Sequence, residues 1–303
     1  MIALRVGRRT IEISNEHKVL FGAGGVTKGE LIGYYREVSE VMVPHLEGRP
    51  LTIQRFPDGI DKNGFYQKDA SKYLPEWIHT RRLPKDKGTV NHVICDNAAT
   101  LVYLANQAAI TLHTGTSRVD RVEQPDQLIF DLDPPEGDFR SAQEASELVR
   151  KLLDEVGLPH FTKTTGGKGL HIVVPLRRGR HYREVRAFAD DAARLLARRA
   201  PQRLTTEVRI AKRAGRLYVD VGRNAYGAHA VAPYSVRPRP TAPVSTPLFD
   251  EELTDQDLHP ERFTVASVLE RVDSQGDPWV EMRRGAVSLG PARAALDELI
   301  AEA

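Results

Sequence analysis

The stretch DQLIFDLDPPEG, residues 126–137, alternates apolar and polar side chains in its middle, as a half-buried β-strand does. Its apolar face consists of Leu128, Phe130 and Leu132. Asp131 and Asp133 are two residues apart, so their carboxylates point together to the opposite face. Pro134 and Pro135 have no backbone N–H and must end the strand directly after the second carboxylate. The stretch therefore predicts a sheet strand with two acidic side chains at its end.

Two carboxylates at a strand end are typical ligands of hard divalent cations such as Mg²⁺ and Mn²⁺, which take oxygen donors. The alternative is a polar strand face with two solvated aspartates, because neighbouring like charges repel only weakly in water. A third acid lies in the stretch RLYVDV, residues 216–221, where Asp220 shares the polar face of an expected strand with Tyr218. Three carboxylates on strand faces can hold two metal ions, although Asp220 alone also fits an ordinary surface position.

The composition fits a globular protein with a large core. The chain has 303 residues, of which 41% are hydrophobic, and its formal net charge is +2. It has no run of 18 apolar residues, and its N-terminus lacks a signal-peptide core, so we expect a cytoplasmic protein without a membrane partner. A single cysteine, Cys95, excludes a disulfide framework and a thiolate zinc site. Residues 177–216 carry thirteen basic and four acidic side chains, which fits a bound polyanion and a solvated helix face equally well.

A glycine-rich loop follows the acidic strand. Residues 164–169 read TTGGKG and precede an expected strand at residues 170–174. Glycines let backbone N–H groups approach a phosphate, and Lys168 adds a positive charge. The spacing is not that of a P-loop, and an ordinary glycine turn explains the same letters. A single histidine before the acidic strand, His113, is by itself more typical of a structural role.

Other segments give a coarse secondary structure. Thr27 with Glu30, and Ser141 with Glu144, predict capping boxes that open two helices. Five prolines at residues 233–247 predict an extended arm laid across the surface. A hairpin and two further helices are expected at residues 2–13, at residues 181–200 and after Pro291.

Three segments together resemble a known family. They are LIFDLDPPEG, TTGGKGLHIVVPL and YVDVGRNAYGAHAVAPYSVRPR, in this order. From about residue 11 to residue 248 the chain is similar to the polymerase domain of bacterial ATP-dependent DNA ligase D, a member of the archaeo-eukaryotic primase superfamily. The resemblance implies an α/β primase-polymerase fold, in which a central mixed β-sheet carries the metal-binding carboxylates and is flanked by helices.

The resemblance also implies roles for individual residues. The catalytic, metal-binding carboxylates fall on Asp131, Asp133 and Asp220. The positions that match the nucleotide pocket are His113, Thr165, Lys168, His171 and Arg237. The positions that match the sites for the downstream DNA 5′-phosphate and the template are Asn15, Lys18, Lys28, Phe65 and Tyr66. Thr27 as N-cap is expected to leave free backbone N–H groups beside Lys28, where a phosphate can bind.

The chain departs from the family in two places. Many members carry an aromatic residue shortly after the histidine, in an H-P-W-like motif, whereas residues 113–118 read HTGTSR here. The ligase signature K-x-D-G does not occur in the sequence. We therefore expect a stand-alone polymerase or an excised domain, and the start at Met1 with a closing helix favours the stand-alone form.

The expected function is template-directed nucleotidyl transfer in DNA repair. The resemblance implies two divalent metal ions, Mn²⁺ or Mg²⁺, and nucleoside triphosphate substrates with ribonucleotides preferred over deoxyribonucleotides. It also implies primed, gapped or broken DNA with a downstream 5′-phosphate as a partner, in end joining or in excision-repair gap filling. Ku and a DNA ligase are candidate protein partners. Such a protein is expected in the bacterial cytoplasm, associated with the nucleoid.

We expect residues 1–303 to form one catalytic domain. Its parts are a DNA-end-binding part at about residues 1–95, a catalytic core at about 96–250, and a C-terminal arm and helix at about 251–303. Two alternatives stay open, a non-catalytic adaptor that binds 5′-phosphorylated DNA ends and a metal-dependent nuclease. An adaptor gains nothing from three acids beside DNA, because they repel phosphates unless metal is present. A nuclease uses similar acids, but the glycine-lysine loop fits a triphosphate better.

Overall fold

The computed structural model describes residues 1–302, whose tertiary contacts divide them into two units. Unit 1 comprises Met1–Asp120, His229–Thr246 and Glu261–Asp277. Unit 2 comprises Arg121–Ala228, Pro247–Pro260 and the residues from Pro278 onward. Each unit is assembled from segments that are far apart in the sequence, and each has its own sheet. No helix within residues 1–302 is long and apolar enough to cross a membrane.

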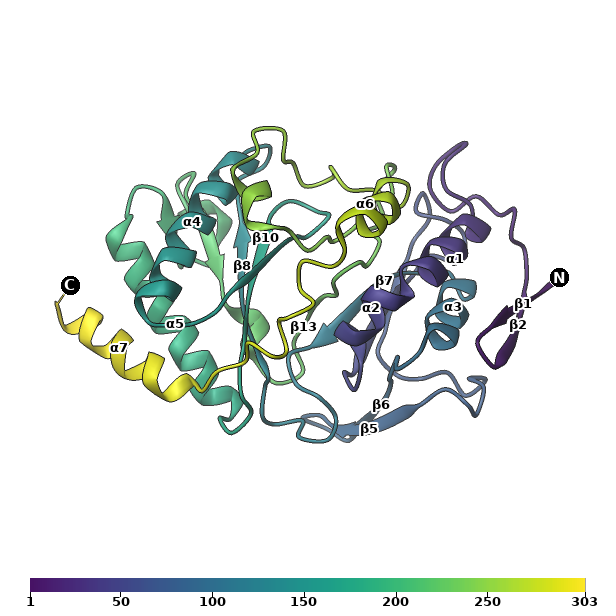
Figure 1. Ribbon diagram of the computed structural model, residues 1–303, viewed down its shortest axis with the longest axis horizontal. Coiled ribbons are helices and arrows are strands. Elements are labelled where there is room, and N and C mark those ends of the chain that lie inside the picture. The colour runs from purple at the N-terminus through teal and green to yellow at the C-terminus, as the bar shows by residue number, and fades with distance from the viewer. Residues whose placement is uncertain (303) are drawn as a thin grey trace. The chain divides into compact units, whose positions relative to one another are not determined.

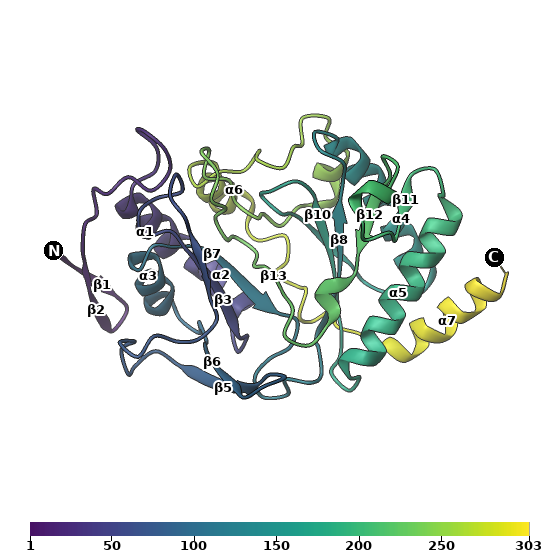
Figure 2. The ribbon, with the colours of Figure 1, turned by 180° about the vertical axis from the view of Figure 1, so that it is seen from behind.

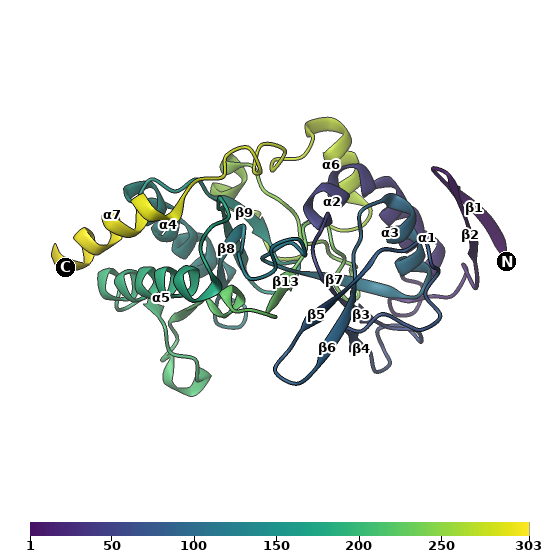
Figure 3. The same ribbon diagram turned by 90° about the horizontal axis from the view of Figure 1, so that it is seen from below.

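Unit 1 contains a four-stranded antiparallel sheet with the strand order β13-β7-β3-β4. Figure 1 labels two of its strands, β7 and β13. Its strands are β3 (Leu51–Arg55), β4 (Phe65–Gln67), β7 (Ala109–Gly115) and β13 (His229–Val231). Two separate hairpins consist of β1 (Ile2–Val6) with β2 (Arg9–Ile13) and β5 (Thr80–Pro84) with β6 (Thr89–Val93). Figure 3 shows the turn of the second hairpin extending away from the helices of this unit. The hairpin expected at residues 2–13 is confirmed.

Four helices belong to unit 1. They are α1 (Lys28–Glu37), α2 (Ser39–Leu46), α3 (Ala98–Asn106) and α6 (Ser267–Gln275). The capping box of Thr27 and Glu30 is confirmed, because both reciprocal hydrogen bonds are present. The apolar side of α1 is buried against α3, and α3 packs against β7. The Tyr35 hydroxyl fastens α1 to the sheet by donating to the carbonyl of Ile110 at 2.5 Å.

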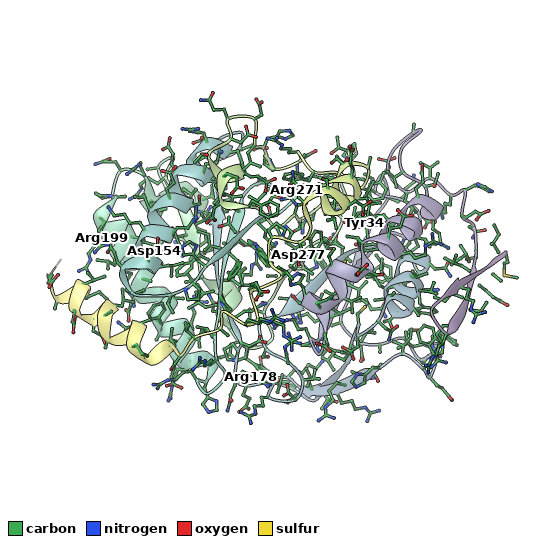
Figure 4. The ribbon with its side chains drawn as sticks, in the orientation of Figure 1. Tyr34, Asp154, Arg178, Arg199, Arg271 and Asp277 are labelled. Carbon is green, nitrogen blue, oxygen red and sulfur yellow. The ribbon has the colours of Figure 1, made fainter. Side chains whose placement is uncertain are left out.

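The proline-rich residues 233–246 pass through the core of unit 1, so the expectation of a surface arm was wrong. Tyr234, Val236 and Val244 are completely buried, and the last two pair across a β-bridge. The Tyr234 hydroxyl donates to Asp277 at 2.7 Å, and the Tyr234 backbone carbonyl accepts from the Tyr34 hydroxyl at 2.8 Å. Figure 4 labels the two partners, Tyr34 and Asp277. Prolines keep this segment extended, but the apolar side chains between them gain more from burial than from lying in solvent.

Unit 2 contains a five-stranded sheet with the strand order β11-β12-β8-β10-β9. Its strands are β8 (Gln127–Asp133), β9 (Phe161–Thr164), β10 (Leu170–Pro175), β11 (Leu204–Thr205) and β12 (Leu217–Asp220). The sheet is mixed, because β11 runs parallel to β12 while the other neighbours are antiparallel. The apolar face expected for β8 is completely buried.

The helices of unit 2 are α4 (Phe139–Glu155), α5 (Tyr182–Arg199) and α7 (Leu289–Glu302), with short 3₁₀ turns at η1 (Ile210–Lys212), η2 (Gly222–Asn224) and η3 (Asp250–Thr254). Figure 2 shows α4 and α5 on the same side of β8. Arg199, labelled in Figure 4, joins the C-terminal ends of these two helices by donating to Glu155 at 2.6 Å. The helix expected at residues 181–200 is confirmed.

The capping box expected at Ser141 and Glu144 was wrong. The N-cap of α4 is Asp138, whose carboxylate accepts from the Ser141 N–H at 3.1 Å. Ser141 therefore lies inside the first turn, and its own hydroxyl donates back to the Asp138 carbonyl. Aspartate and serine are both good N-caps. Asp138 comes first after the proline turn, so the helix begins there.

One buried side chain ties β8 to the turn η2. The Asn224 amide accepts from the Ile129 N–H at 2.8 Å and donates to the Ile129 carbonyl at 2.7 Å. It donates also to the Val221 carbonyl at 2.9 Å. Asn224 thus continues the hydrogen bonding of β12 along β8, past the point where β12 ends at Asp220.

Replacing Asn224 by alanine should lower the free energy of unfolding by about 2–4 kcal/mol, because the Ile129 N–H and carbonyl lose their partners. The measurement is urea denaturation of the wild type and the variant. The matched control is Asn63→Ala, at an exposed position, which should change the stability by less than about 0.5 kcal/mol. Equal stability of the two variants would contradict the assigned role of Asn224.

Candidate active site

Four strands of unit 2 place ionisable side chains in one row. Asp131 on β8 lies directly opposite Asp220 on β12 and opposite His171 on β10. His171 in turn lies opposite Lys163 on β9. Directly paired residues of antiparallel strands project from the same face of a sheet. We call these four residues the central row.

The second carboxylate of β8 lies in the next row, where Asp133 is opposite Tyr218. Arginines hold both β8 carboxylates. Arg223 donates to Asp131 at 3.2 Å, and Arg213 donates to Asp133 at 2.9 Å. The Arg213 guanidinium also stacks on the Tyr218 ring, at 4.3 Å from its centre. These two arginines compensate acids that would otherwise repel one another.

The third carboxylate is held by its own strand end. Asp220 accepts from the Gly222 N–H at 2.7 Å and lies 3.3 Å from the Tyr218 hydroxyl. The side chain is therefore anchored by a backbone donor, while its position opposite Asp131 keeps it on the same face as the β8 acids. All three acids predicted from the sequence lie on this face.

Burial and neighbouring charges set the protonation of the central row. Burial alone would raise the pKa of Asp131, but His171 and Arg223 lower this pKa to about 2. Burial and the charge of Lys163 lower the pKa of His171 to about 4, against the opposing effect of Asp131. At neutral pH Asp131 is therefore ionised and His171 is neutral. The Nε2 atom of neutral His171 lies 3.4 Å from Oδ1 of Asp131. The positive charge that compensates Asp131 comes from Arg223.

The donor set fits a hard divalent cation, because three carboxylates lie on one face of neighbouring strands. Within residues 1–302, however, no three aspartate, glutamate, histidine or cysteine side chains converge closely enough to hold a metal ion. In this arrangement Arg223 and Arg213 each contact one oxygen of Asp131 and Asp133, respectively. A cation and a guanidinium neutralise the same charge, so metal binding here requires the arginines to give up these contacts.

Thr165 closes the glycine loop that joins β9 to β10. Its hydroxyl accepts from the N–H groups of Gly167 and Gly169 at 3.3 and 3.2 Å. The N–H groups of Gly166 and Lys168 donate to no protein acceptor in the described part of the chain, and the Lys168 side chain is exposed. The expectation that the loop presents backbone N–H groups thus holds for two of them, while Thr165 uses the other two.

Gly169 also fixes the distance between this loop and the acidic strand. A Cβ atom at Gly169 would lie 1.9 Å from the Leu132 carbonyl oxygen, so only glycine fits. The loop therefore passes directly beside the β8 segment that carries Asp131 and Asp133.

Two residues predicted for the nucleotide pocket, His113 and Arg237, lie in unit 1, whereas Thr165, Lys168 and His171 lie in unit 2. His113 is on β7, and the centre of its ring is 5.8 Å from that of Tyr66 on β4. Phe65 and Tyr66, the predicted template residues, are 46% and 63% exposed, as a contact surface requires.

The residues predicted for the 5′-phosphate meet at the start of α1 in unit 1. Lys18 follows Asn15 in one turn, and the Lys28 N–H donates to the Lys18 carbonyl at 2.8 Å. The ammonium of Lys28 donates to the Ser14 carbonyl and hydroxyl, and burial together with the charge of Lys18 lowers its pKa. Lys18 is exposed and pairs with Asp58 at 2.8 Å.

The prediction that free backbone N–H groups at this helix start bind phosphate was wrong. The N–H groups of Lys28 and Gly29 donate to the carbonyls of Lys18 and Glu16, and that of Glu30 donates to Thr27. The preceding turn folds back over the helix start, so its carbonyls take the donors that a phosphate would need. A phosphate here depends on side chains instead.

Sequence reasoning missed three cationic residues of the site, Arg213, Arg223 and Lys163. Arg223 comes three residues after Asp220, and Lys163 on β9 directly precedes the glycine-rich loop at residues 164–169. These two signals do not by themselves identify site residues, because strand neighbours cannot be deduced from the sequence alone. The pairing of β12 with β8 and of β9 with β10 turns them into site residues.

A family model of the LigD primase-polymerase domain matches residues 27–279. The chain belongs to this family. Members are nucleotidyltransferase-type DNA or RNA polymerases that depend on metal ions. The primase-polymerase fold predicted from the sequence is thereby confirmed.

Individual relatives agree with this assignment. The chain is 33% identical over 270 residues to the multifunctional non-homologous end joining protein LigD of Mycolicibacterium smegmatis, and 31% identical over 276 residues to the bifunctional non-homologous end joining protein LigD of Bacillus subtilis. These matches cover 88% and 90% of this chain but 35% and 44% of the relatives, so the chain spans less than half their length. Among solved structures, the polymerase domain from Mycobacterium tuberculosis ligase D in complex with DNA matches with a TM-score of 0.85 and 32% identity, over 91% of this chain and 99% of that one.

In metal-free protein, the free energy of unfolding should fall as the pH drops from about 6.5 to about 4. Unfolded His171 takes up a proton in this range, whereas folded His171, with its pKa lowered to about 4, does not. The loss should be on the order of 2–3 kcal/mol, and His171→Gln should remove it. Asp131 adds a loss only below about pH 3.8, as the pH falls towards its folded pKa of about 2.

The measurement is urea denaturation in a chelating buffer at a series of pH values. His259→Gln, at an exposed histidine of the same unit, is the matched control and should keep the wild-type slope. The same pH dependence in the wild type and in His171→Gln would contradict the assignment of a neutral, buried His171.

Proposed function

We propose that this chain adds nucleotides to a primer 3′-hydroxyl opposite a template and fills short gaps or ends that carry a downstream 5′-phosphate. The observation that carries the proposal is the face of unit 2 on which Asp131, Asp133 and Asp220 lie beside a glycine-lysine loop. The carboxylates are suited to bind divalent metal ions. The loop offers two unused backbone N–H groups and the Lys168 ammonium to the phosphates of a nucleotide. Both halves of a nucleotidyl transfer site are thus within one unit.

In this proposal, Asp131, Asp133 and Asp220 hold two Mn²⁺ or Mg²⁺ ions. Bound divalent metal supplies a lowered pKa for the primer hydroxyl and charge compensation for the leaving pyrophosphate. The chain's own contribution is to orient the triphosphate with the loop N–H groups and Lys168. Arg213 and Arg223, once they leave the carboxylates, are bidentate donors suited to phosphate oxygens. His171, neutral and buried, keeps Asp131 oriented.

The DNA contacts of the proposal lie in unit 1. Asn15, Lys18 and Lys28 take the 5′-phosphate, and Phe65 with Tyr66 contacts the template. The complex of the related Mycobacterium tuberculosis domain with DNA supports DNA as the partner of this chain. His113 and Arg237, the positions of unit 1 that match the family's nucleotide contacts, are assigned to nucleotide binding in this proposal, with ribonucleotides preferred. The proposal keeps the three functional parts expected from the sequence, at about residues 1–95, about 96–250 and about 251–303.

The last part of the proposal concerns the DNA-repair pathway in which the protein acts. The relatives are named for non-homologous end joining, which supports a role in end joining. Ku and a DNA ligase are the protein partners that this role would require. Excision-repair gap filling uses the same chemistry. Either role places the protein on the nucleoid in the cytoplasm. A primed, gapped duplex with Mn²⁺ and nucleotides separates the proposal from its rivals, because a polymerase extends the primer, a nuclease shortens it and an adaptor leaves it unchanged.

Asp131→Asn and Asp220→Asn should each reduce primer extension by at least about a hundredfold while DNA binding stays within twofold, because the metal contributes several kcal/mol to the transition state and little to the binding of DNA ends. Extension is followed on labelled primer in Mn²⁺ and in Mg²⁺. Asp257→Asn, at an exposed acid of the same unit, is the control and should extend normally. Near-normal primer extension by either site variant would contradict the assignment of these carboxylates as metal ligands.

A downstream 5′-phosphate should tighten DNA binding by about 1–3 kcal/mol relative to a 5′-hydroxyl, the size of a few charge-assisted hydrogen bonds. Lys18→Ala should erase most of this difference, because Lys18 is the exposed cation of the site. The matched control is Lys62→Ala, an exposed lysine of the same unit that should leave the difference intact. Binding titrations are made at one fixed salt concentration. Equal binding of both DNA ends by the wild type would remove the case for a gap-filling enzyme.

A further inference from the structure

Tyr234 has a backbone conformation that a bulky residue rarely adopts. Its φ angle is 63°, in the left-handed region, and within residues 1–302 no other aromatic residue has a positive φ. Such a conformation is unfavourable for a residue with a Cβ atom, so it persists only where the surrounding structure holds it. Strained residues of this kind gather at functional sites. The contacts of Tyr234 and of the residues that follow it are therefore informative.

A buried chain of hydrogen bonds holds the Tyr234 side chain. Its hydroxyl donates to Oδ1 of Asp277 at 2.7 Å, and Oδ2 of Asp277 lies 2.8 Å from Nε2 of His45 on α2. The side chains of His45 and Asp277 are only 7% and 9% exposed. Burial, together with the charge of Asp277, raises the pKa of Tyr234, so its hydroxyl stays a donor. These three residues come from three separate stretches of unit 1, and we call them the tyrosine anchor.

The backbone that follows Tyr234 is fixed along β7. The regular pairing of β13 with β7 ends shortly before Tyr234. Beyond it, the Leu112 N–H donates to the Ser235 hydroxyl at 2.8 Å, and the Thr111 hydroxyl donates to the Val236 carbonyl at 2.7 Å. The left-handed residue thus interrupts the strand pairing, and side chains continue it on the other side.

Arg237 takes its position from this backbone. The Val236 N–H donates to the Tyr35 hydroxyl at 3.1 Å, and the Arg237 N–H donates to the Pro243 carbonyl at 2.7 Å. Residues 234–236 are completely buried, whereas Arg237 is partly exposed. The arginine therefore stands at the point where a fixed, buried segment reaches the surface. Its guanidinium can be placed accurately only if the turn before it keeps its conformation.

We propose that Tyr234 is a positioning residue of the nucleotide site: its hydroxyl, held by Asp277 and His45, keeps the left-handed turn in place and thereby places Arg237 for the nucleotide. The inference rests on the proposed function and deepens it, because Arg237 is assigned to nucleotide binding there. Tyr234 is completely buried, so it acts through Arg237 and does not touch the nucleotide. A turn alone would be satisfied by glycine, which adopts positive φ without strain but has no side chain to anchor.

The test is the steady-state kinetics of primer extension on a gapped duplex with Mn²⁺. Tyr234→Phe removes one oxygen atom and keeps the ring. It should raise the KM for the nucleotide about three- to tenfold and leave kcat within about twofold, because a misplaced Arg237 weakens the ground state and the transition state alike. Asp277→Ala should do the same. Asp277→Asn should keep the wild-type KM, because its amide can accept from Tyr234 and donate to His45.

Two further variants separate positioning from general stability. Asn97→Ala removes the N-cap of α3 in unit 1 and destabilises the fold without touching the anchor, so it should leave the KM unchanged. His45→Gln, at the far end of the anchor, should raise the KM in the same direction as Tyr234→Phe. It keeps the test decisive if Tyr234→Phe does not fold, which circular dichroism shows.

A double-mutant cycle shows whether the effect passes through Arg237. Arg237→Ala should raise the KM by itself, and adding Tyr234→Phe to it should raise the KM no further, since the residue being positioned is then absent. An additional rise of the same size in the double variant would mean that the two residues act independently. That result would overturn the inference.

The remaining outcomes distinguish the anchor from the function on which it rests. If the wild type extends primers but Tyr234→Phe and His45→Gln leave the KM unchanged, the positioning role is wrong and the proposed function survives. Equal rises in Tyr234→Phe and Asn97→Ala also overturn it, because stability alone then explains the effect. If the wild type does not incorporate nucleotides at all, the proposed function fails together with the inference.

Discussion

The repulsion among three carboxylates on two neighbouring strands is the constraint on which unit 2 depends. Asp131 is directly opposite Asp220, and Asp133 is one step along the same face. Two ionised acids this close to the protein interior are stable only with nearby positive charge or backbone donors. Arg223, Arg213 and the N–H of Gly222 supply these.

Several unusual positions follow from that constraint. Lys163 is a lysine with 2% exposure, and it lies in the central row next to His171. Burial, together with the charge of this ammonium, lowers the pKa of the intervening His171 and keeps it neutral. Asn224 secures the strand next to the acids, because β12 is too short to satisfy β8 along its whole length. The site is therefore an electrostatic balance held by hydrogen bonds on its strands.

The sequence predicts those features that depend on neighbours in the chain. Alternation in residues 126–137 predicts the face of Asp131 and Asp133, and the proline pair predicts the end of β8. It does not predict partners that depend on the strand order, so Arg213 and Lys163 were missed. Burial of residues 233–246 was missed for a similar reason, since proline content describes the backbone and not the surface on which it lies. The wrong cap of α4 is a choice between two suitable side chains only three residues apart, where local propensity does not decide.

The two candidate phosphate sites show how the same local signal leads to different chemistry. A capped helix start and a glycine loop both predict backbone N–H groups for an anion. At α1 the carbonyls of the preceding turn accept from these N–H groups, which leaves the side chains of Lys18 and Lys28 as the cations at this helix start. In the loop, Thr165 takes two donors but, by closing the loop, holds the remaining two in place. Side-chain sites bind by charge and weaken with salt, whereas backbone donors give direction. A long, variable DNA end suits the first kind, and a triphosphate that must be aligned for reaction suits the second.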